Sequence, residues 1–419
     1  MLFGFTVLLG KSVRALARLR GGGSALPGLF VEKIDRQFVA KSLSKFPCGV
    51  VIISGTNGKT TTTKIAVELL ECQGLKVFTN RTGSNFSRGV AAALLADMDL
   101  RGRVQADIAV LELDEAHGAN FVQDIKPTYS LILNVMRDQL DRFGEIDTTA
   151  QLLEKIVAST AKNVVLNRHD PRIVKLAKSA KAKVSYFGLN KNLLKEFPAD
   201  DEMYKTTKNS TRLPKADVTL ESLNKKTIFS LGGKNFETTL QLSGIYNLYN
   251  ATAALALVKT IMGGRLKTKP LIAALAKVTP AFGRGEVVHI GGHPLELVLV
   301  KNPSGFRLAL RSFSGDNYKT MIAINDNFAD GRDMSWLWDV DFTSLPSVSM
   351  VSGLRADDMA LRLYYDEVEY LNIESNLAQG LRKFIANNSR APKRIYCTYT
   401  AMLAIRKELA KITKIEAVI

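Results

Sequence analysis

A strand, a glycine-containing turn and a helix follow one another near residue 50, and this stretch constrains the fold more than any other. The β-branched run at residues 50–53 predicts a buried strand, and a helix-length segment extends over residues 59–73. Between them lies the sequence G-T-N-G-K-T, whose glycines permit a tight turn. The backbone N–H groups of such a turn and the helix N-terminus present partial positive charge to a phosphate. The pattern therefore predicts a phosphate-binding loop.

Two side chains of this loop suit a nucleotide with its metal ion. Lys59 adds a full positive charge, and the Thr60 hydroxyl can bind Mg²⁺. The usual form, G-x-x-x-x-G-K-[ST], needs glycine at position 53, where this chain has Ile53, so the loop is a shorter variant. An ordinary glycine-rich turn is the alternative, but the coincidence of strand, both glycines, lysine and hydroxyl favours nucleotide binding. The predicted nucleotide contacts in the loop are Gly55, Thr56, Asn57, Gly58, Lys59, Thr60 and Thr61.

The composition is that of a globular protein with more than one domain. The chain has 419 residues, of which 46% are hydrophobic and 23% are charged, and this length allows two or three domains. The net charge of +17 admits nucleic acid, anionic lipid or an anionic substrate as a partner, as well as a merely solvated basic surface. Lys and Arg are scattered and form no long block. We therefore favour an acidic or phosphorylated substrate and predict no nucleic-acid partner.

Cysteine usage and the first residues bear on the compartment. Cys48, Cys72 and Cys397 are odd in number and far apart, which excludes a disulfide framework or a four-cysteine zinc site and predicts a reducing, cytoplasmic setting. Residues 1–9 are apolar but too short to span a bilayer, and basic residues follow rather than precede them, so a signal peptide is not expected. This segment is expected to be a helix that lies on a membrane face or, as is commoner, docks on the protein's own core.

Apolar strands separated by helix-length segments continue along the first half of the chain. Further strands are predicted at residues 75–79, 107–113, 129–134 and 163–167, and a helix at residues 29–46 leads into the first strand. Strands and helices that alternate in this way form a parallel, doubly wound sheet, whose ligands bind beyond the C-terminal ends of the strands. The predicted fold class is therefore α/β, with a central phosphate-binding domain.

Two changes of pattern mark the domain organisation. Residues 191–242 are rich in Lys, Asn, Thr and Ser with alternating apolar residues, which predicts a small antiparallel β appendage. After a junction near residues 283–286 the alternation of strands and helices resumes. We predict a first domain at residues 1–286, made of N-terminal helices and the nucleotide-binding domain, and a smaller Rossmann-like α/β domain at residues 287–419. The strands of the second domain are expected near residues 295–300, 320–325, 348–352 and 394–398.

Three carboxylates, Glu112, Asp114 and Glu115, end the strand predicted at residues 107–113. One of them is well placed to complete a Mg²⁺ shell with Thr60 and the nucleotide phosphates. We favour Glu112 and, after it, Glu115 as the metal ligand. Helix-capping acids are the alternative, and this alternative fits two of the three.

Charged and polar side chains also follow other predicted strands. The sequence R-D-Q-L-D-R at residues 137–142 follows the fourth strand of the first domain. A single charge there would be a surface ion pair, but four charges at the mouth of the predicted site favour phosphate or substrate binding, with Asp138 and Arg142 as candidates. Lys301 and Asn302 occupy the corresponding place after the first strand of the second domain.

The sequence shows no covalent catalytic machinery of its own. No cysteine lies in a nucleophile motif, and the histidines lack metal-binding spacing. The four histidines are His117, His169, His289 and His293. A second-domain loop at residues 325–333 is dense in acids and amides, which favours a functional role over a purely structural Asx-rich turn.

In their order along the chain these motifs resemble those of the Mur ligases. The shared features are the loop at residues 55–60, N-x-x-x-D-x-x-D-R from residue 134, Y-N-x-x-N-A from residue 246, G-R at residue 283 and K-N-P at residue 301. The second-domain sequences N-D-N-x-A-D-G-R-D-x-S-W, S-G-x-R-A and Y-T-A-M are similar to the MurT family, the ligase-like subunits of lipid II isoglutaminyl synthases. The resemblance covers nearly the whole chain, and these second-domain motifs are its specific part.

The resemblance implies an amidation that uses ATP and Mg²⁺. The D-glutamate α-carboxylate in the stem peptide of lipid II would be phosphorylated by ATP, and ammonia would attack the acyl phosphate to give D-isoglutamine. In the family the ammonia comes from a separate GatD-type glutaminase subunit of a heterodimer, which agrees with the missing nucleophile. A stand-alone Mur-like amino-acid ligase and a non-catalytic nucleotide-binding scaffold for a glutaminase are the alternatives.

The resemblance also implies roles for single residues. Asp333 matches the aspartate that completes the partner's Cys-His pair as a triad, where it would orient and stabilise the imidazolium. Asn250 would lie near the adenine, and Arg284 and Lys301 near phosphate or substrate. Through the same K-N-P motif, Lys301 and Asn302 are predicted to bind substrate. Many MurT chains carry a four-cysteine zinc ribbon, but residues 191–242 contain no cysteine, so no structural zinc is predicted. A lipid II substrate implies a location at the inner face of the cell membrane.

Overall fold

The chain divides into two compact units. The computed structural model describes residues 2–19, 26–80, 87–99, 101–136, 146–196, 213–223, 226–242, 244–279, 284–313 and 317–413. The first unit comprises Met1–Val135, Asp147–Gln241 and Asn247–Val278, and the second unit Met136–Ile146, Leu242–Tyr246 and Thr279–Ile419. The second unit thus begins its main segment at Thr279, a few residues before the boundary predicted after residue 286.

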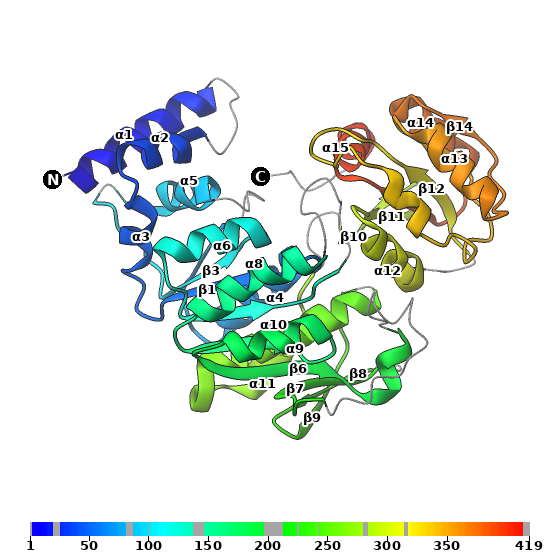
Figure 1. Ribbon diagram of the computed structural model, residues 1–419. Helices are drawn as coiled ribbons and strands as arrows, with labels where there is room; N and C mark the ends of the chain where they lie inside the picture. The colour runs from blue at the N-terminus through cyan, green and yellow to red at the C-terminus, as the bar shows by residue number, and fades with distance from the viewer. Residues whose placement is uncertain are drawn as a thin grey trace. The chain divides into compact units, whose positions relative to one another are not determined.

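A nine-stranded sheet forms the centre of the first unit, in the order β2-β3-β1-β4-β5-β6-β7-β8-β9 (Figure 1). Neighbouring strands from β2 to β7 pair in parallel. The first six strands are β1 (Val50–Ser54), β2 (Val77–Thr79), β3 (Ile108–Glu112), β4 (Tyr129–Ile132), β5 (Asn163–Asn167) and β6 (Lys183–Leu189). Every residue of β1, β3 and β5 is buried, because both faces of a parallel sheet are covered. The predicted parallel α/β sheet is confirmed, with β6 as an additional strand.

The polar segment predicted as a separate appendage instead extends this sheet. Its strands are β7 (Val218–Ser222), β8 (Thr227–Leu231) and β9 (Lys234–Thr238), which pair in the antiparallel sense expected from their alternating pattern. However, β7 also pairs in parallel with β6, with Phe187 opposite Val218. Alternation along one strand shows which face is buried, but it does not show which strand lies alongside.

Helices of the first unit follow the apolar periodicity of the sequence. They are α1 (Leu2–Leu19), α2 (Leu26–Ile34), α3 (Phe38–Leu43), α4 (Lys59–Cys72), α5 (Ser87–Asp97), α6 (Glu115–Asp124), α8 (Ile146–Ser159), α9 (Pro171–Leu176), α10 (Ile245–Met262) and α11 (Thr268–Leu275), with the short 3₁₀ helices η1 (Ala177–Ser179), η2 (Lys191–Glu196) and η3 (Gly263–Arg265). Across the described parts of the chain, no helix combines the length and the apolar character needed to cross a bilayer.

The single helix predicted at residues 29–46 is wrong, since the structure has two helices there, α2 and α3. Asp35 separates them, because its carboxylate accepts a hydrogen bond from the backbone N–H of Gln37 at 3.0 Å. The carbonyl of Asp35 also accepts from the N–H of Phe38 at 2.9 Å. An aspartate that binds its own downstream backbone offers the chain a turn in place of a helix.

A six-stranded sheet in the order β10-β11-β15-β12-β13-β14 forms the second unit (Figure 1). The elements are β10 (Arg284–Ile290), β11 (His293–Leu299), α12 (Pro303–Phe313), β12 (Lys319–Ala323), η4 (Ser335–Asp339), β13 (Met350–Ser352), α13 (Ala356–Tyr365), β14 (Ile373–Glu374), α14 (Leu377–Asn387), β15 (Lys393–Cys397) and α15 (Tyr399–Leu409). All pairs are parallel except β10 with β11. The strand β10 occupies the segment that the sequence suggested was only a junction.

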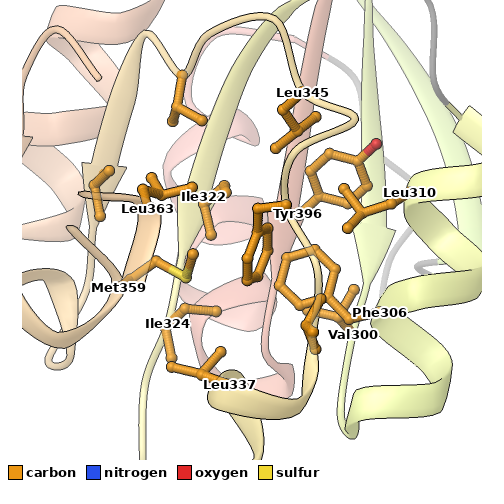
Figure 2. Packing of buried hydrophobic residues seen from close by; sticks show 14 of the residues in the cluster. Val300, Phe306, Leu310, Ile322, Ile324, Leu337, Leu345, Met359, Leu363 and Tyr396 are labelled. Carbon is orange, nitrogen blue, oxygen red and sulfur yellow. The ribbon is translucent and has the colours of Figure 1, made fainter. Parts of the chain in front are cut away.

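An aromatic cluster fills one side of the second sheet. The ring of Phe306 from α12 lies 5.0 Å from that of Phe342 and 5.5 Å from that of Tyr396, measured between centroids. Figure 2 shows Phe306 and Tyr396 beside Ile322 and Leu337, and all are buried. This packed core fixes the strand ends and the loops that follow them.

Candidate functional site

The loop predicted to bind phosphate joins β1 to α4 in the first unit. Gly55 and Gly58 have φ angles of 131° and 88°, a region that side-chain-bearing residues rarely adopt. A Cβ atom on Gly55 would lie 3.0 Å from the backbone N and O of Asn134, and one on Gly58 would lie 2.3 Å from Oδ1 of Asn250. Both positions therefore require glycine for conformation and for space. The second contact also places Asn250, from α10, directly against the loop.

Asn134, which follows β4, holds the loop in shape. Its side chain accepts a hydrogen bond from the N–H of Asn57 at 2.8 Å and donates one to the carbonyl of Asn57 at 2.9 Å. Its own carbonyl accepts from the N–H of Thr56 at 3.0 Å. Asn134 appears in the sequence motif that resembles the Mur ligases, but this bracing role requires the strand order, because β4 lies next to β1 only in the folded sheet.

Lys59 is buried at the start of α4 and faces two carboxylates. Its ammonium donates to the carbonyl of Gly55 at 2.7 Å and lies 3.0 Å from Asp114 and 3.6 Å from Glu115. Burial alone would lower the pKa of Lys59, but the charges of Glu115, Asp114 and Glu112 outweigh burial and raise this pKa above its ordinary value. The loop therefore holds a permanent positive charge in a site largely closed to solvent.

Thr60 and Glu112, two of the predicted metal ligands, lie next to each other. The Thr60 hydroxyl donates to Oε1 of Glu112 at 2.8 Å. Asn80, after β2, fixes the backbone of Glu112 from the other side, since its side chain accepts from the Glu112 N–H at 2.9 Å and donates to the Glu112 carbonyl at 2.8 Å. Glu115 is buried next to Lys59 instead, so its predicted role at the metal remains a prediction.

The donor set suits a magnesium ion that retains water and phosphate ligands. A hydroxyl and a carboxylate are both hard oxygen donors, and Mg²⁺ in nucleotide sites is usually held by one or two protein oxygens, with waters and phosphates in the remaining positions. Among the residues that the structure describes, no group of three or more His, Cys, Asp or Glu side chains is placed to form a closed metal cage. Thr60 and Glu112 therefore fit Mg²⁺ that arrives with a nucleotide.

A second set of polar contacts ties the ends of β4 and β5 to α10. The Asn167 side chain donates to the carbonyl of Leu133 at 2.9 Å and accepts from the Tyr249 hydroxyl at 2.5 Å. The Asp170 carboxylate accepts from the N–H of Val135 at 2.7 Å. Burial raises the pKa of Asp170 to about 6, although backbone N–H groups oppose the shift. Asn167, Asp170 and Tyr249 were not among the predicted site residues. The sequence signal for Asn167 and Asp170 is their place at or just after the end of β5.

Three predicted site residues cannot be related to the loop by geometry. Asp138 and Arg142 lie outside the described residues. Arg284 is the first residue of β10 in the second unit, and the structure describes its backbone but not its side chain. Their predicted roles in binding nucleotide or substrate therefore remain predictions.

Lys301 and Asn302 precede α12 in the second unit. Asn302 is buried, and its side chain accepts from the N–H of Gly305 at 2.7 Å. Its carbonyl accepts from the N–H of Phe306 at 3.0 Å. This capping of the helix start is a structural role for Asn302, while substrate binding by Lys301 and Asn302 remains a prediction.

The acid- and amide-rich loop after β12 is fastened to the start of α15. The Asp330 carboxylate accepts from the N–H of Thr400 at 2.7 Å and from its hydroxyl at 2.5 Å. The side chains of Asn325 and Asn327 donate to the same hydroxyl oxygen at 3.1 and 2.8 Å. Asn325 also accepts from the N–H of Leu354 at 3.0 Å, which joins the loop after β13. Burial raises the pKa of Asp330, against the hydrogen bonds from Thr400.

Asp333 lies a few residues further along, two positions before η4 begins at Ser335. Its carboxylate accepts from the backbone N–H of Ser335 at 2.9 Å. Hydrogen bonds from the hydroxyl and N–H of Ser335 lower the pKa of Asp333, so the group is ionised at neutral pH. Large side chains near it in sequence or along α13 are exposed, namely Phe328, Trp338, Tyr364 and Tyr365.

Both halves of the chain match known families. Residues 53–258 match the family described as Mur ligase middle domain, and residues 299–402 match MurT ligase C-terminal. Among solved structures, MurF from Acinetobacter baumannii has a TM-score of 0.70 at 17% identity, and the match covers 91% of this chain and 80% of that chain. MurF from Thermotoga maritima, solved in complex with ADP, has a TM-score of 0.66 at 18% identity, covering 90% of this chain and 83% of that chain. These likenesses show a Mur ligase-type fold.

Curated relatives identify the branch. The subunit MurT of the glutamine-hydrolyzing lipid II isoglutaminyl synthase of Streptococcus pneumoniae is 32% identical, over 96% of each chain. The subunit of the same name from Staphylococcus aureus is 27% identical, over 86% of this chain and 87% of that chain. The match to UDP-N-acetylmuramoylalanine--D-glutamate ligase of Burkholderia multivorans is 29% identical but covers only 61% of this chain and 52% of that chain. The chain is therefore an ATP-dependent ligase of the Mur type and belongs to the MurT family.

Proposed function

We propose that this chain is the synthetase subunit of a two-chain amidotransferase that converts the D-glutamate of the lipid II stem peptide to D-isoglutamine. The observation that carries the proposal is the buried Lys59, with Thr60 and Glu112 beside it, in a chain of the MurT family. The relatives in Streptococcus pneumoniae and Staphylococcus aureus are named for lipid II isoglutaminyl synthase, which supports the same substrate and product here.

The reaction requires activation because a carboxylate oxygen is a poor leaving group. One oxygen of the substrate carboxylate attacks the γ-phosphorus of ATP, ADP leaves, and an acyl phosphate forms. The ammonia nitrogen then attacks the acyl carbon, inorganic phosphate leaves with that oxygen, and the nitrogen loses a proton to give the amide. Lys59 is the residue that we assign to the phosphoryl oxygens, since its buried charge stabilises the extra negative charge of the transition state.

Magnesium supplies charge neutralisation at the β- and γ-phosphates when it is bound. We assign its protein ligands to Thr60 and Glu112, which already meet at 2.8 Å. Glu115 is the second candidate, and it would have to leave Lys59, 3.6 Å away. Asn250, next to Gly58, is assigned to the nucleotide.

Ammonia is proposed to come from a GatD-type glutaminase subunit that docks on the second unit. Asp333 would orient the partner's catalytic histidine and stabilise its positive charge. The loop around Asp330 is held by hydrogen bonds from Thr400. This supports the assignment, because a side chain that acts on another protein must itself be held in position. Trp338 and Tyr365 are exposed and lie 5.3 Å apart between ring centroids, and aromatic side chains of this kind are enriched at protein interfaces.

An assay with the purified chain, ATP, lipid II and ammonium chloride tests the proposal. We expect amidated lipid II and ADP without any added amino acid. If product forms only when an amino acid is supplied, the chain is a stand-alone ligase. If neither ammonia nor the glutaminase with glutamine yields product, the proposed function is wrong.

The substitution Asp333→Asn should affect glutamine-driven and ammonium-driven amidation differently. In the presence of the partner we expect glutamine-driven amidation to fall at least about a hundredfold, while ammonium-driven amidation stays within about twofold, because the triad belongs to the glutaminase reaction. The matched control is Asp341→Asn, since Asp341 also accepts hydrogen bonds from a residue two positions further, Thr343. Equal loss of both reactions in Asp333→Asn would place Asp333 in the chain's own active site instead.

A further inference from the structure

The N-terminal helix α1 is apolar on two sides, and one side is occupied by the first unit itself. A Cβ atom on Gly10 would lie 2.6 Å from Val31 of α2 and 2.8 Å from Leu95 of α5, so α1 approaches both helices closely. Phe3 stacks on Phe38 with ring centroids 5.4 Å apart, and Val7 is completely buried. Docking on the protein core, one of the two outcomes expected from the sequence, therefore accounts for one face of α1.

The other side of α1 carries large apolar residues in solvent. Phe5, Leu8 and Leu16 are between 53% and 59% exposed, and helical periodicity places them on one face together with exposed Ser12. Helix α2 packs against α1 (Figure 1). It adds a second exposed series, because Leu26, Phe30 and Ile34 are between 37% and 52% exposed. Six large apolar side chains exposed on two adjacent helices exceed the scattered surface residues of an ordinary soluble domain.

The first 45 residues, which include α1 and α2, form a strongly basic segment. Its only two acids are Glu32 and Asp35, and both have basic neighbours, with Arg88 at 4.0 Å from Glu32 and Lys41 at 3.0 Å from Asp35. The basic residues of the first 45 positions are Lys11, Arg14, Arg18, Arg20, Lys33, Arg36, Lys41 and Lys45. A segment with exposed apolar faces and excess basic residues has the chemistry of a helix pair that lies in the interface of an anionic bilayer.

We propose that the exposed faces of α1 and α2 bind the surface of an anionic lipid bilayer, with Phe5, Leu8, Leu16 and Phe30 inserted among the headgroups. The choice of a bilayer rests on the proposed function, because a lipid-linked substrate reaches the chain only at a membrane. Charge complementarity supports the same choice. Two copies of this basic segment would repel each other, whereas anionic headgroups attract it. The contact would hold the chain at the plane in which its substrate diffuses.

Vesicle co-sedimentation of the full chain tests this inference without reference to its activity. We expect binding to vesicles of phosphatidylglycerol mixed with phosphatidylcholine to be at least about tenfold tighter than to phosphatidylcholine alone, and to weaken with salt. The double variant Leu8→Asp, Leu16→Asp should lose at least about tenfold in affinity for the anionic vesicles. Leu371→Asp is the matched control, because Leu371 is equally exposed but lies in the second unit, and it should bind as the wild type does.

Three results would overturn the inference. The first is equal binding of wild type and the double variant, and the second is equal binding to both vesicle types. The third is a wild type that self-associates and does not bind vesicles, together with a double variant that is monomeric. That result would make these faces a contact between two copies of the chain. Thermal unfolding of the double variant should match that of wild type, since both positions are exposed. Failure of the proposed function is seen separately, because wild type would then bind anionic vesicles but form no amide with ammonium chloride.

Discussion

Both units have polar loops beyond the ends of parallel strands, but they differ in how far the charged side chains of these loops are buried. In the first unit, Lys59 is buried with Asp114 and Glu115 within 3.6 Å. In the second unit, Asp330 is fixed by Thr400 while nearby Asp333 has a local hydrogen bond with Ser335 and is partly exposed. The first arrangement concentrates charge inside the protein, and the second stabilises a loop that presents charge outward.

This difference corresponds to the two parts of the proposed reaction. A buried lysine among carboxylates suits a small anionic ligand that arrives with a metal ion and is enclosed by the protein. A carboxylate on a braced loop suits a macromolecule that docks against it. Changes at the first site should therefore abolish the reaction with every ammonia source, and changes at the second should affect only the partner-dependent route.

Lys59→Ala should have the largest effect. We expect ammonium-driven amidation to fall by about a thousandfold or more, because the transferred phosphoryl group loses its buried cation. The matched control is Lys64→Ala in the same helix, where the ammonium is 3.8 Å from Glu68 at the surface and should leave activity within about twofold. Initial rates of ADP release and of amide formation measure both variants.

The same variant separates an enzyme from a scaffold. A nucleotide-binding scaffold would support amidation by its partner after Lys59→Ala, whereas a ligase would not. Thermal unfolding must accompany the assay, because removal of Lys59 leaves Asp114 and Glu115 without their buried counter-charge.

Gly58→Ala should weaken nucleotide binding by at least about tenfold. Gly58 directly precedes α4, and its new methyl group would lie 2.3 Å from the side chain of Asn250 in α10. Gly74→Ala is the control. Gly74 has a similar φ of 93°, but a Cβ there meets nothing within 4 Å. Both variants carry the same kind of backbone strain, so only Gly58→Ala should lose ATP affinity in a titration by calorimetry. Equal affinities would remove Asn250 and Gly58 from the nucleotide site.

The second unit provides a comparison of stability. Asp330→Ala should lower the free energy of unfolding of this unit by about 2 to 3 kcal/mol, because it leaves the N–H of Thr400 and the N–H of Asn327 without their acceptor. Asp333→Ala should cost less than about 1 kcal/mol, since Asp333 is partly exposed and its hydrogen-bond partner within the described part of the chain is the nearby Ser335. Urea unfolding followed by the fluorescence of Trp336 and Trp338 measures both. A larger cost for Asp333→Ala would mean that its position has a structural purpose.

Much of the fold follows from local patterns in the sequence. Short, mainly apolar runs predicted β1, β3, β4 and β5, because strands covered on both faces of a parallel sheet are mainly apolar. The break between α2 and α3 was missed because Asp35 ends a helix through its own side chain, within a segment of helical periodicity. The placement of β7 beside β6 depends on pairing between distant segments, which no local pattern encodes.

The candidate site also contains residues that local sequence predicts and residues that it does not. Residues within the loop were predicted because their spacing is local, and Glu112 was predicted because it ends a strand. Asn80, Asn134 and Asn167 were not predicted as bracing residues, because a single asparagine after a strand is also the ordinary signature of a turn. Their function depends on neighbouring strands in the sheet, which bring each amide to the backbone of another loop.

Transfer of an oxygen atom from the substrate carboxylate to phosphate is the signature of an acyl phosphate formed at the Lys59 site. Lipid II labelled with ¹⁸O in the D-glutamate α-carboxylate would be incubated with the purified chain, ATP and ammonium chloride, and the released phosphate analysed by mass spectrometry. We expect one ¹⁸O atom in phosphate for each amide formed, and none when Lys59→Ala replaces the wild type. Amide formation with unlabelled phosphate would contradict an acyl phosphate formed at the Lys59 site.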